Sequence, residues 1–149
     1  MGSIMAGVYA RLEALERTDS AWLTSVMAPF TPVTFGLTTV AAGGWANVSG
    51  SSAGFSLTAR PAHVLVIADL NAHVTGTNTA FARVAIDGAY AGGAQPVFYN
   101  TTSPIPATMI ALSGVLAIGS HTATIQGLAS GTDTLNVYSG DTLVFLLGA

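Results

Sequence analysis

Residues 63–68, His-Val-Leu-Val-Ile-Ala, and residues 142–147, Thr-Leu-Val-Phe-Leu-Leu, are apolar on both faces of an extended chain. A strand of this kind is covered twice, once by its own sandwich and once by another element. In a monomer such strands favour aggregation, whereas in a closed homotrimer they can line the subunit interface. The second strand therefore supplies the predicted oligomerisation residues of the body, which are Leu143, Phe145 and Leu147.

Several segments between these two strands alternate strictly. In residues 81–86, Arg83 and the other odd-numbered side chains point to one face, and the even-numbered, apolar side chains point to the other. This alternation is typical of antiparallel sheets with one face in the core. Short runs of β-branched and aromatic residues, bounded by Gly, Asn, Asp, Ser or Pro, extend the prediction along the chain. We expect strands near residues 33–40, 46–49, 54–59, 63–74, 79–86, 96–100, 107–117, 119–127, 132–138 and 141–147.

About ten short strands at this density predict two packed sheets, for which a jelly roll is the compact solution. Asp87-Gly88, Ser130-Gly131 and Ser139-Gly140-Asp141 lie between β runs, where glycine supplies the positive φ of a turn. The predicted fold class is an all-β antiparallel jelly-roll sandwich, preceded by a short N-terminal α-helix.

The N-terminal segment has a helical period instead. From Met5 to Val26 the apolar residues are spaced alternately three and four apart, as in a coiled coil, with Asp19 the one polar member. Arg11 and Glu16 fall at the g and e positions that meet between parallel chains. The alternative is an amphipathic helix that lies on its own domain. The predicted oligomerisation residues of the helix are Val8, Leu12, Leu15, Trp22, Arg11 and Glu16.

Two prolines mark the boundary between helix and body. Pro29 and Pro32 lack a backbone donor and bias the preceding residue toward extended geometry, so the helix ends before them. We therefore expect three parts. Residues 1–27 form an oligomerisation or anchoring helix, residues 28–32 a Pro-containing linker, and residues 33–149 the β jelly-roll domain.

The composition is unusually poor in charge. Charged residues make up 7%, against a typical value of about 25%, and hydrophobic residues make up 50%. The apolar excess must be buried in a membrane, a large core or a subunit interface. A membrane-spanning helix needs about 20 mostly apolar residues, and the runs here are shorter, so we expect no membrane insertion. The first ten residues lack the pattern of a classical signal peptide, which favours synthesis in a cytoplasm.

Several function classes lack their usual residues. The chain has no cysteine, which excludes thiolate catalysis, disulfides and cysteine metal sites. It has four Lys and Arg residues in all and a net charge of −3, so nucleic acid is not an expected partner. No nucleophile elbow, phosphate loop or dinucleotide fingerprint is present. We expect no enzymatic activity, no catalytic residues and no cofactor.

We expect structural roles for the ionisable residues of the body. His63 and His73 share a face of one strand but lie about 33 Å apart at ~3.3 Å per residue, so they cannot hold one ion within a subunit. No metal site is expected, although a ring of histidines across a threefold axis is an alternative. Asp69 interrupts an apolar strand, so it either faces solvent or needs a partner, for which Arg60 and Arg83 are the candidates. The expected role of both Asp133 and Asp141 is to cap turns.

Residues 119–147 carry a family resemblance. They contain a Gly119-Ser-His-Thr strand, a loop of small residues around Thr132 to Asn136, and the apolar strand Leu143 to Leu147. Upstream, Val64-Leu-Val-Ile-Ala and Arg83-Val-Ala-Ile-Asp-Gly match a strand followed by an Asp-Gly hairpin. The chain thus resembles trimeric jelly-roll domains on bacteriophage fibres and head or tail appendages, which look like the tumour-necrosis-factor and C1q-type fold.

This resemblance implies a non-enzymatic structural protein of a bacteriophage virion. It would be a homotrimeric knob on the capsid or tail, as a capsid decoration, tail fibre or minor tail protein, assembled in the host cytoplasm. Its partners would be copies of itself and, through the N-terminal segment, other virion proteins. A secreted C1q-like ligand shares the fold, but the chain lacks a signal peptide and a collagen-like repeat.

The alternative function is a carbohydrate- or receptor-binding module for host adsorption at a tail or fibre tip. Exposed aromatic side chains give a large contact area at low entropic cost, and they recur in sites for saccharides and proteins. The candidate aromatics for a host-surface glycan are Trp45, Tyr90 and Tyr99, which lie near predicted loops or strand ends. More often such residues simply pack beneath loops.

Overall fold

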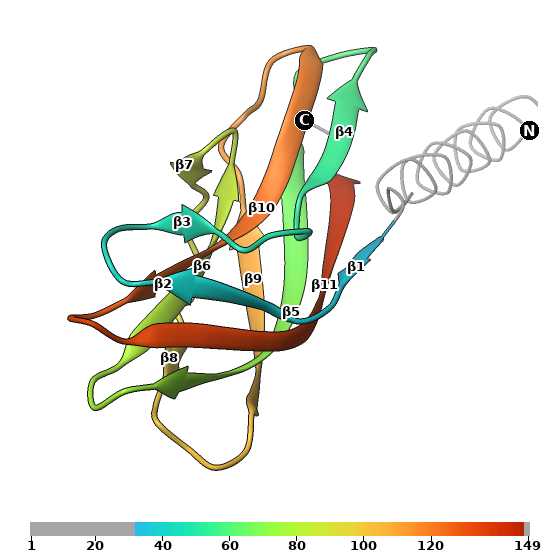
Figure 1. Cartoon of the computed structure of the whole chain (residues 1–149). Coiled ribbons are helices and arrows are strands. Elements are labelled where there is room, and N and C mark those ends of the chain that lie inside the picture. Colours follow the sequence, from blue (N-terminus) through green and yellow to red (C-terminus); the bar gives the residue numbers. More distant parts are fainter. Residues whose placement is uncertain (1–31, 148–149) are drawn as a thin grey trace, which may run out of the picture.

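The computed structural model describes residues 32–147, which form two antiparallel β-sheets packed face to face (Figure 1). The predicted N-terminal helix lies outside the described residues. No helix long and apolar enough to cross a membrane occurs in residues 32–147. The strands are β1 (Val33–Phe35), β2 (Thr38–Ala41), β3 (Ala46–Asn47), β4 (Ala53–Leu57), β5 (His63–Thr75), β6 (Ala80–Ile86), β7 (Ala89–Tyr90), β8 (Val97–Phe98), β9 (Ile105–Leu112), β10 (Gly119–Ala129) and β11 (Thr134–Leu147).

The chain passes back and forth between the two sheets. The first sheet has the order β1-β11-β5-β9, and β2 also pairs with β11. The second has the order β3-β10-β6-β7, with β4 beside β10 and β8 beside β6. Consecutive long strands therefore lie in opposite sheets, as in a jelly roll. The predicted all-β antiparallel jelly-roll class is confirmed for the described residues.

The core lies between the sheets and follows from the alternation in sequence. Val64, Val66 and Val144 of the first sheet are at most 1% exposed, as are Val84 and Ile125 of the second. In β5 and along most of β11, buried and more exposed residues alternate, so these strands have one fully buried face. In β10, residues 123–127 are all buried. Burial of these side chains is the main favourable contribution to folding.

The C-terminal strand corrects one prediction. Two strands separated by a turn at Ser139-Gly140-Asp141 were expected, but β11 is continuous and pairs with β5 on both sides of a register shift between Val137 and Ser139. Gly140 is buried against Phe35, and a Cβ atom there would overlap the Phe35 ring and lie 2.5 Å from the Asp69 carbonyl oxygen. Glycine is required here for a close approach and not for a turn.

Of the two aspartates expected to cap turns, one does so. The carboxylate of Asp133 is buried and accepts hydrogen bonds from the backbone N–H groups of Thr77 and Asn78, at 3.4 Å and 2.6 Å. It therefore holds the connection from β5 to β6. The prediction for Asp141 is wrong, because its carboxylate lies within β11 and accepts a 2.5 Å hydrogen bond from the Thr34 hydroxyl of β1.

Of the two alternatives for Asp69, the one in which it faces solvent is confirmed, and the ion pair with Arg60 or Arg83 is not formed. Asp69 is exposed on β5 and accepts a 2.6 Å hydrogen bond from the hydroxyl of Thr108 on β9. Within residues 32–147 the one ion pair joins His121 to Asp87. Asp69 needs no buried counter-ion because it faces solvent.

Candidate functional site

The outward side of the first sheet carries a continuous apolar surface built by strand register. Phe145 of β11, Leu65 of β5 and Leu112 of β9 lie opposite one another and form one row across three strands. A second, parallel row is formed by Leu143, Ile67 and Ile110. We call these six residues the outer apolar face.

The outer apolar face keeps much of its surface exposed. Ile110 and Leu112 are 55% and 54% exposed, and Leu143 and Phe145 are half-buried. Leu147, the third predicted residue of this strand, is half-buried opposite His63, one row beyond Phe145. The structure thus places all three predicted oligomerisation residues of the body on one side of the first sheet, together with side chains of β5 and β9.

Carboxylates border the outer apolar face on one side. Asp141 and Asp69 lie opposite one another on β11 and β5, in the row next to Leu143 and Ile67. Like charges in such positions are unfavourable, and here each carboxylate accepts a hydrogen bond from a threonine hydroxyl. An open depression of about 520 Å³ adjoins them, lined among others by Asn71. The surface therefore has an apolar centre and an acidic border.

The point where the described chain begins adjoins the same face. Val33 of β1 pairs with Thr142 of β11, one residue before Leu143. Residues 1–31 therefore join the body beside the outer apolar face. The predicted helix residues Val8, Arg11, Leu12, Leu15, Glu16 and Trp22 lie outside the described residues.

On the opposite sheet, two of the three candidate aromatics meet around an arginine. Arg83 of β6 lies with its Cζ atom 4.1 Å from the centre of the Trp45 ring and 5.5 Å from that of Tyr90. Trp45 comes from the loop before β3 and Tyr90 from β7, and in the sheet order these strands flank β6 on opposite edges. Both contacts are within the range of cation–π attraction.

Two amide side chains extend this cluster across β10 to β3. The Arg83 Nε atom donates a 2.9 Å hydrogen bond to Gln126 Oε1. The Gln126 Nε2 atom in turn donates to Asn47 Oδ1 at 3.1 Å. Because a guanidinium can only donate, this chain of bonds sets the orientation of both amides. We call Arg83, Trp45, Tyr90, Gln126 and Asn47 the Arg83 cluster.

The third candidate aromatic lies elsewhere. Tyr99 is 55% exposed and follows Phe98, which pairs with Ala80 at the start of β6. Tyr90 pairs with Ala85 near the other end of β6, five residues away, which is about 17 Å along a strand. Tyr99 is therefore not part of the Arg83 cluster.

The two histidines of β5 make separate contacts. The Nδ1 atom of His63 is 2.9 Å from the Ser113 carbonyl oxygen, and the His73 ring packs edge-on against Tyr138. Among residues 32–147, no group of three or more His, Asp or Glu side chains gathers in the manner of a metal site.

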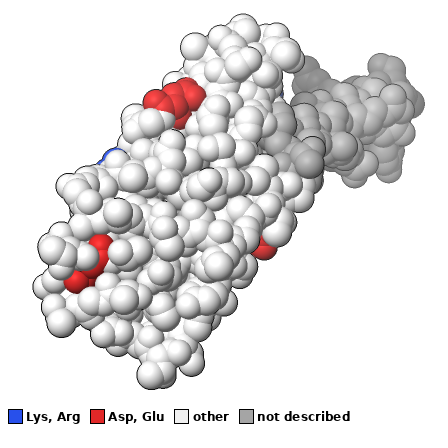
Figure 2. All heavy atoms as spheres, viewed as in Figure 1, with Lys and Arg blue, Asp and Glu red and all other residues white. Residues whose placement is uncertain are grey.

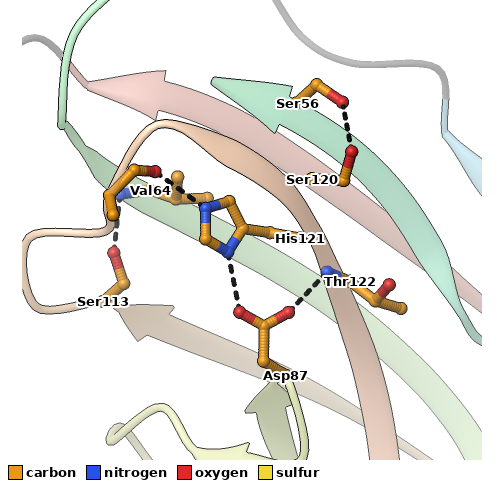
Figure 3. A network of polar contacts seen from close by, with 8 residues as sticks. Ser56, Val64, Asp87, Ser113, Ser120, His121 and Thr122 are labelled. Carbon is orange, nitrogen blue, oxygen red and sulfur yellow. Dashed lines mark hydrogen bonds and ion pairs between the residues drawn. The ribbon is translucent and has the colours of Figure 1, made fainter. Parts of the chain in front are cut away.

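The third histidine, His121, forms a network of polar contacts that no sequence pattern indicated (Figure 3). Its Nδ1 atom is 2.7 Å from Asp87 Oδ2, and its Nε2 atom is 2.9 Å from the carbonyl oxygen of Ala117. Asp87 Oδ1 accepts a further hydrogen bond from the backbone N–H of Thr122. Both ring nitrogens face acceptors, which is the arrangement that a doubly protonated imidazolium satisfies.

The hydrogen bonds of this pair shift the pKa values of His121 and Asp87 in opposite directions. The hydrogen bond with Asp87, followed by that with the Ala117 carbonyl, raises the pKa of His121 above its ordinary value of 6.5. The hydrogen bond with His121 lowers the pKa of Asp87 below its ordinary value of 3.8. Both groups are therefore charged together over a wider range of pH than either would be alone.

This pair predicts a pH-dependent term in stability. The contribution of His121 is complete below pH 6.5 and is lost as the pH rises through the raised pKa of the folded state. The contribution of Asp87 is complete above pH 3.8 and is lost as the pH falls through its lowered pKa. The effect is expected to stay within about 1 kcal/mol, because exposed ion pairs contribute little and Asp87 is 48% exposed.

Asp87→Asn tests this prediction, since asparagine tolerates the positive φ of 51° at this position. Thermal unfolding between pH 5 and pH 9 should show wild-type stability falling toward that of the variant as His121 loses its proton. An NMR titration of the His121 ring should give a lower pKa in the variant. A variant with the wild-type His121 pKa would contradict the assignment.

Two signals in the sequence could have identified these groups. Arg83 and Gln126 lie on the polar faces of alternating segments, and polar side chains on neighbouring strands often interact. The Asp87-Gly88 turn signal placed a carboxylate beside a hairpin but not beside His121. Neither signal specified its partner, because the partners come from strands far apart in the sequence.

Three solved structures resemble the chain at low sequence identity. No family model and no curated protein matches the chain. Dimeric latent PorU from Porphyromonas gingivalis is 8% identical with a TM-score of 0.44, and the match covers 78% of this chain and 13% of that one. Eiger TNF from S. frugiperda is 17% identical over 82% of this chain and 96% of that one, with a TM-score of 0.44. The CBM22-1 xylan-binding domain of Xyn10C from Paenibacillus barcinonensis is 10% identical over 84% and 98%, with a TM-score of 0.43.

Proposed function

We propose that this chain is a non-enzymatic structural protein of a bacteriophage virion that assembles as a homotrimer through the outer apolar face. The observation that carries the proposal is the pair of apolar rows across β11, β5 and β9, next to the point where residues 1–31 join the body. The occupant of this face is a second copy of the chain.

The position of the N-terminal segment supports a second copy as the occupant. Its heptad pattern favours parallel association, which would bring three bodies together at their Val33 ends. Since Val33 lies beside Thr142 and Leu143, the outer apolar faces would then surround one axis. A cyclic arrangement closes the assembly, so no apolar face is left to recruit further copies.

The charge distribution also suits this arrangement. The spheres visible in Figure 2 are mostly uncharged, and the few charged side chains are widely separated. With charged residues at 7%, little electrostatic repulsion opposes contact between copies. Asp69 and Asp141 would form part of a polar rim around the apolar centre, which is the usual composition of a protein interface.

The virion location rests on the resemblance of residues 64–68, 83–88 and 119–147 to phage appendage domains. In this proposal the bodies form a knob on the capsid or tail, and the N-terminal segments dock on other virion proteins. Its work is assembly and presentation, without a chemical step. Mass spectrometry of purified virions, together with antibody labelling of intact particles, tests this location.

A measurement of mass tests the assembly directly. We expect the full chain at micromolar concentration to sediment with about three times the 15.0 kDa of one copy. The reason is that burying apolar surface at about 25 cal/mol per Å² favours a subunit contact over exposure. A stable monomer across this concentration range would contradict the proposal, and a dimer would contradict its threefold form.

A second candidate function is binding of a host-surface carbohydrate, and the Arg83 cluster favours it. Two aromatic rings and two amides converge on one side of the second sheet, which is the composition of a polar ligand site. This function is compatible with the first, because the outer apolar face and the Arg83 cluster lie on different sheets.

A further inference from the structure

The Arg83 cluster has hydrogen-bond donors that are not used within the cluster. They are guanidinium and amide nitrogen atoms, which donate hydrogen bonds and do not accept them. The Oε1 atom of Gln126 and the Oδ1 atom of Asn47 already accept hydrogen bonds within the cluster. Within residues 32–147, the terminal nitrogens of Arg83 and the Nδ2 atom of Asn47 have no hydrogen-bond partner. A ligand that complements these groups must therefore offer acceptors.

The Arg83 guanidinium is also held in place before any ligand arrives. It lies over the Trp45 ring at 4.1 Å, and its Nε atom is bonded to Gln126. The terminal nitrogens then remain as a planar pair, which matches the two oxygens of a carboxylate in bidentate geometry. Less conformational entropy is lost on binding when the donors are already ordered.

No carboxylate of the described chain competes for this position. The ion pair formed within residues 32–147 is that of Asp87 with His121, and it does not involve Arg83. Arg83 therefore lacks a protein counter-ion in the described part of the chain. A single arginine suits a ligand with one negative charge per recognised unit, whereas a nucleic acid requires several cations along its backbone.

We propose that the Arg83 cluster binds a uronate residue of an acidic polysaccharide, an inference that rests on the second candidate function. The sugar carboxylate would accept hydrogen bonds from the terminal nitrogens of Arg83. The sugar ring would pack against Tyr90, which is 42% exposed, and the sugar hydroxyl oxygens would accept from Asn47 Nδ2. An acidic peptide offers the carboxylate but lacks the ring of hydroxyl acceptors, so we favour the sugar.

The proposal is tested with trigalacturonic acid and its methyl ester, titrated into the full chain and followed by calorimetry or by NMR. The two probes have the same ring but differ in charge. We expect saturable binding of the acid, and binding of the ester that is weaker by about tenfold or more, because a charge-assisted bidentate contact is lost.

Arg83→Lys is the informative variant, since it retains the positive charge and the aliphatic stem but loses the planar pair of donors. It should bind the acid about tenfold more weakly than the wild type. Its thermal stability should fall slightly, because the hydrogen bond to Gln126 is also lost, and circular dichroism should show that the β structure is retained. Arg60→Lys is the matched control and should bind like the wild type. Sedimentation of both variants reports self-association separately from ligand binding.

Each other outcome has a defined meaning. Equal binding of the acid and the ester would leave a carbohydrate site but refute the role of the carboxylate. Wild-type affinity in Arg83→Lys would refute the role of Arg83. Equal affinity for hexaglutamate would assign the site to acidic peptides, and no binding of any probe would refute the site. None of these results changes the expected trimer mass, so the proposal of self-association is judged independently.

Discussion

Phe145→Asp should convert the homotrimer into folded monomers. Phe145 is half-buried in a row with Leu65 and Leu112, on the side of β11 that points away from the core. A carboxylate placed at the centre of a self-associating apolar surface loses its hydration and has no cation opposite it. We expect a loss of at least about 2 kcal/mol per contact, or about thirtyfold in the association constant. Sedimentation and light scattering measure the change.

Leu37→Asp provides the matched control for Phe145→Asp. Leu37 is also a large apolar residue, is 74% exposed and lies in the turn between β1 and β2, outside the outer apolar face. The same chemical change there should leave the mass of the assembly unaltered. Circular dichroism should show β structure in both variants. A Phe145→Asp trimer, or dissociation caused equally by both substitutions, would contradict the assigned interface.

Gly140→Ala should strongly destabilise the fold. The added Cβ atom would overlap the Phe35 ring and lie 2.5 Å from the carbonyl oxygen of Asp69. A ring can move only by displacing its neighbours in a packed core, and a backbone carbonyl in a paired strand can hardly move at all. We expect the free energy of unfolding to fall by about 3 kcal/mol, measured by chemical denaturation at fixed protein concentration.

Gly54→Ala controls for the general effect of alanine in a strand. Gly54 lies within β4, and nothing lies within 4 Å of the Cβ position. Alanine there should be neutral or slightly stabilising, because it reduces the conformational entropy of the unfolded chain. If the two variants unfold at the same denaturant concentration, the close packing of β11 against β1 is not a constraint on the fold.

The β class could be predicted because its signals are local. Side chains in residues 81–84 alternate between the two faces of the strand, and Ala82 and Val84 are buried while Phe81 and Arg83 are half-buried. The break at residues 139–141 was misassigned because glycine signals both turns and close contacts, and the distinction depends on Phe35, which is distant in sequence. The same limit applies to Asp69, whose partner proved to be a threonine on a neighbouring strand.

The candidate site was predictable only in part. The last strand is apolar on both faces, which indicates that Leu143 and Phe145 are buried by an element outside their own sandwich. The residue types of this strand are sufficient for that inference. The sequence indicated Trp45 and Tyr90 as candidate ligand-binding aromatics, but it indicated Asp69 and not these rings as the partner of Arg83. A cation–π contact has no characteristic residue spacing in a sequence. The contact of Arg83 with these two rings could therefore not be predicted from spacing.

The alternation of residues and the shortage of charge were enough to establish an all-β chain with surplus apolar surface, because both are properties of short segments and of composition. Strand pairing decided that Phe145, Leu65 and Leu112 share a row and that Trp45 lies on Arg83. These contacts join segments far apart in the chain, and their register is set by hydrogen bonding and packing across whole sheets. No local pattern contains that information.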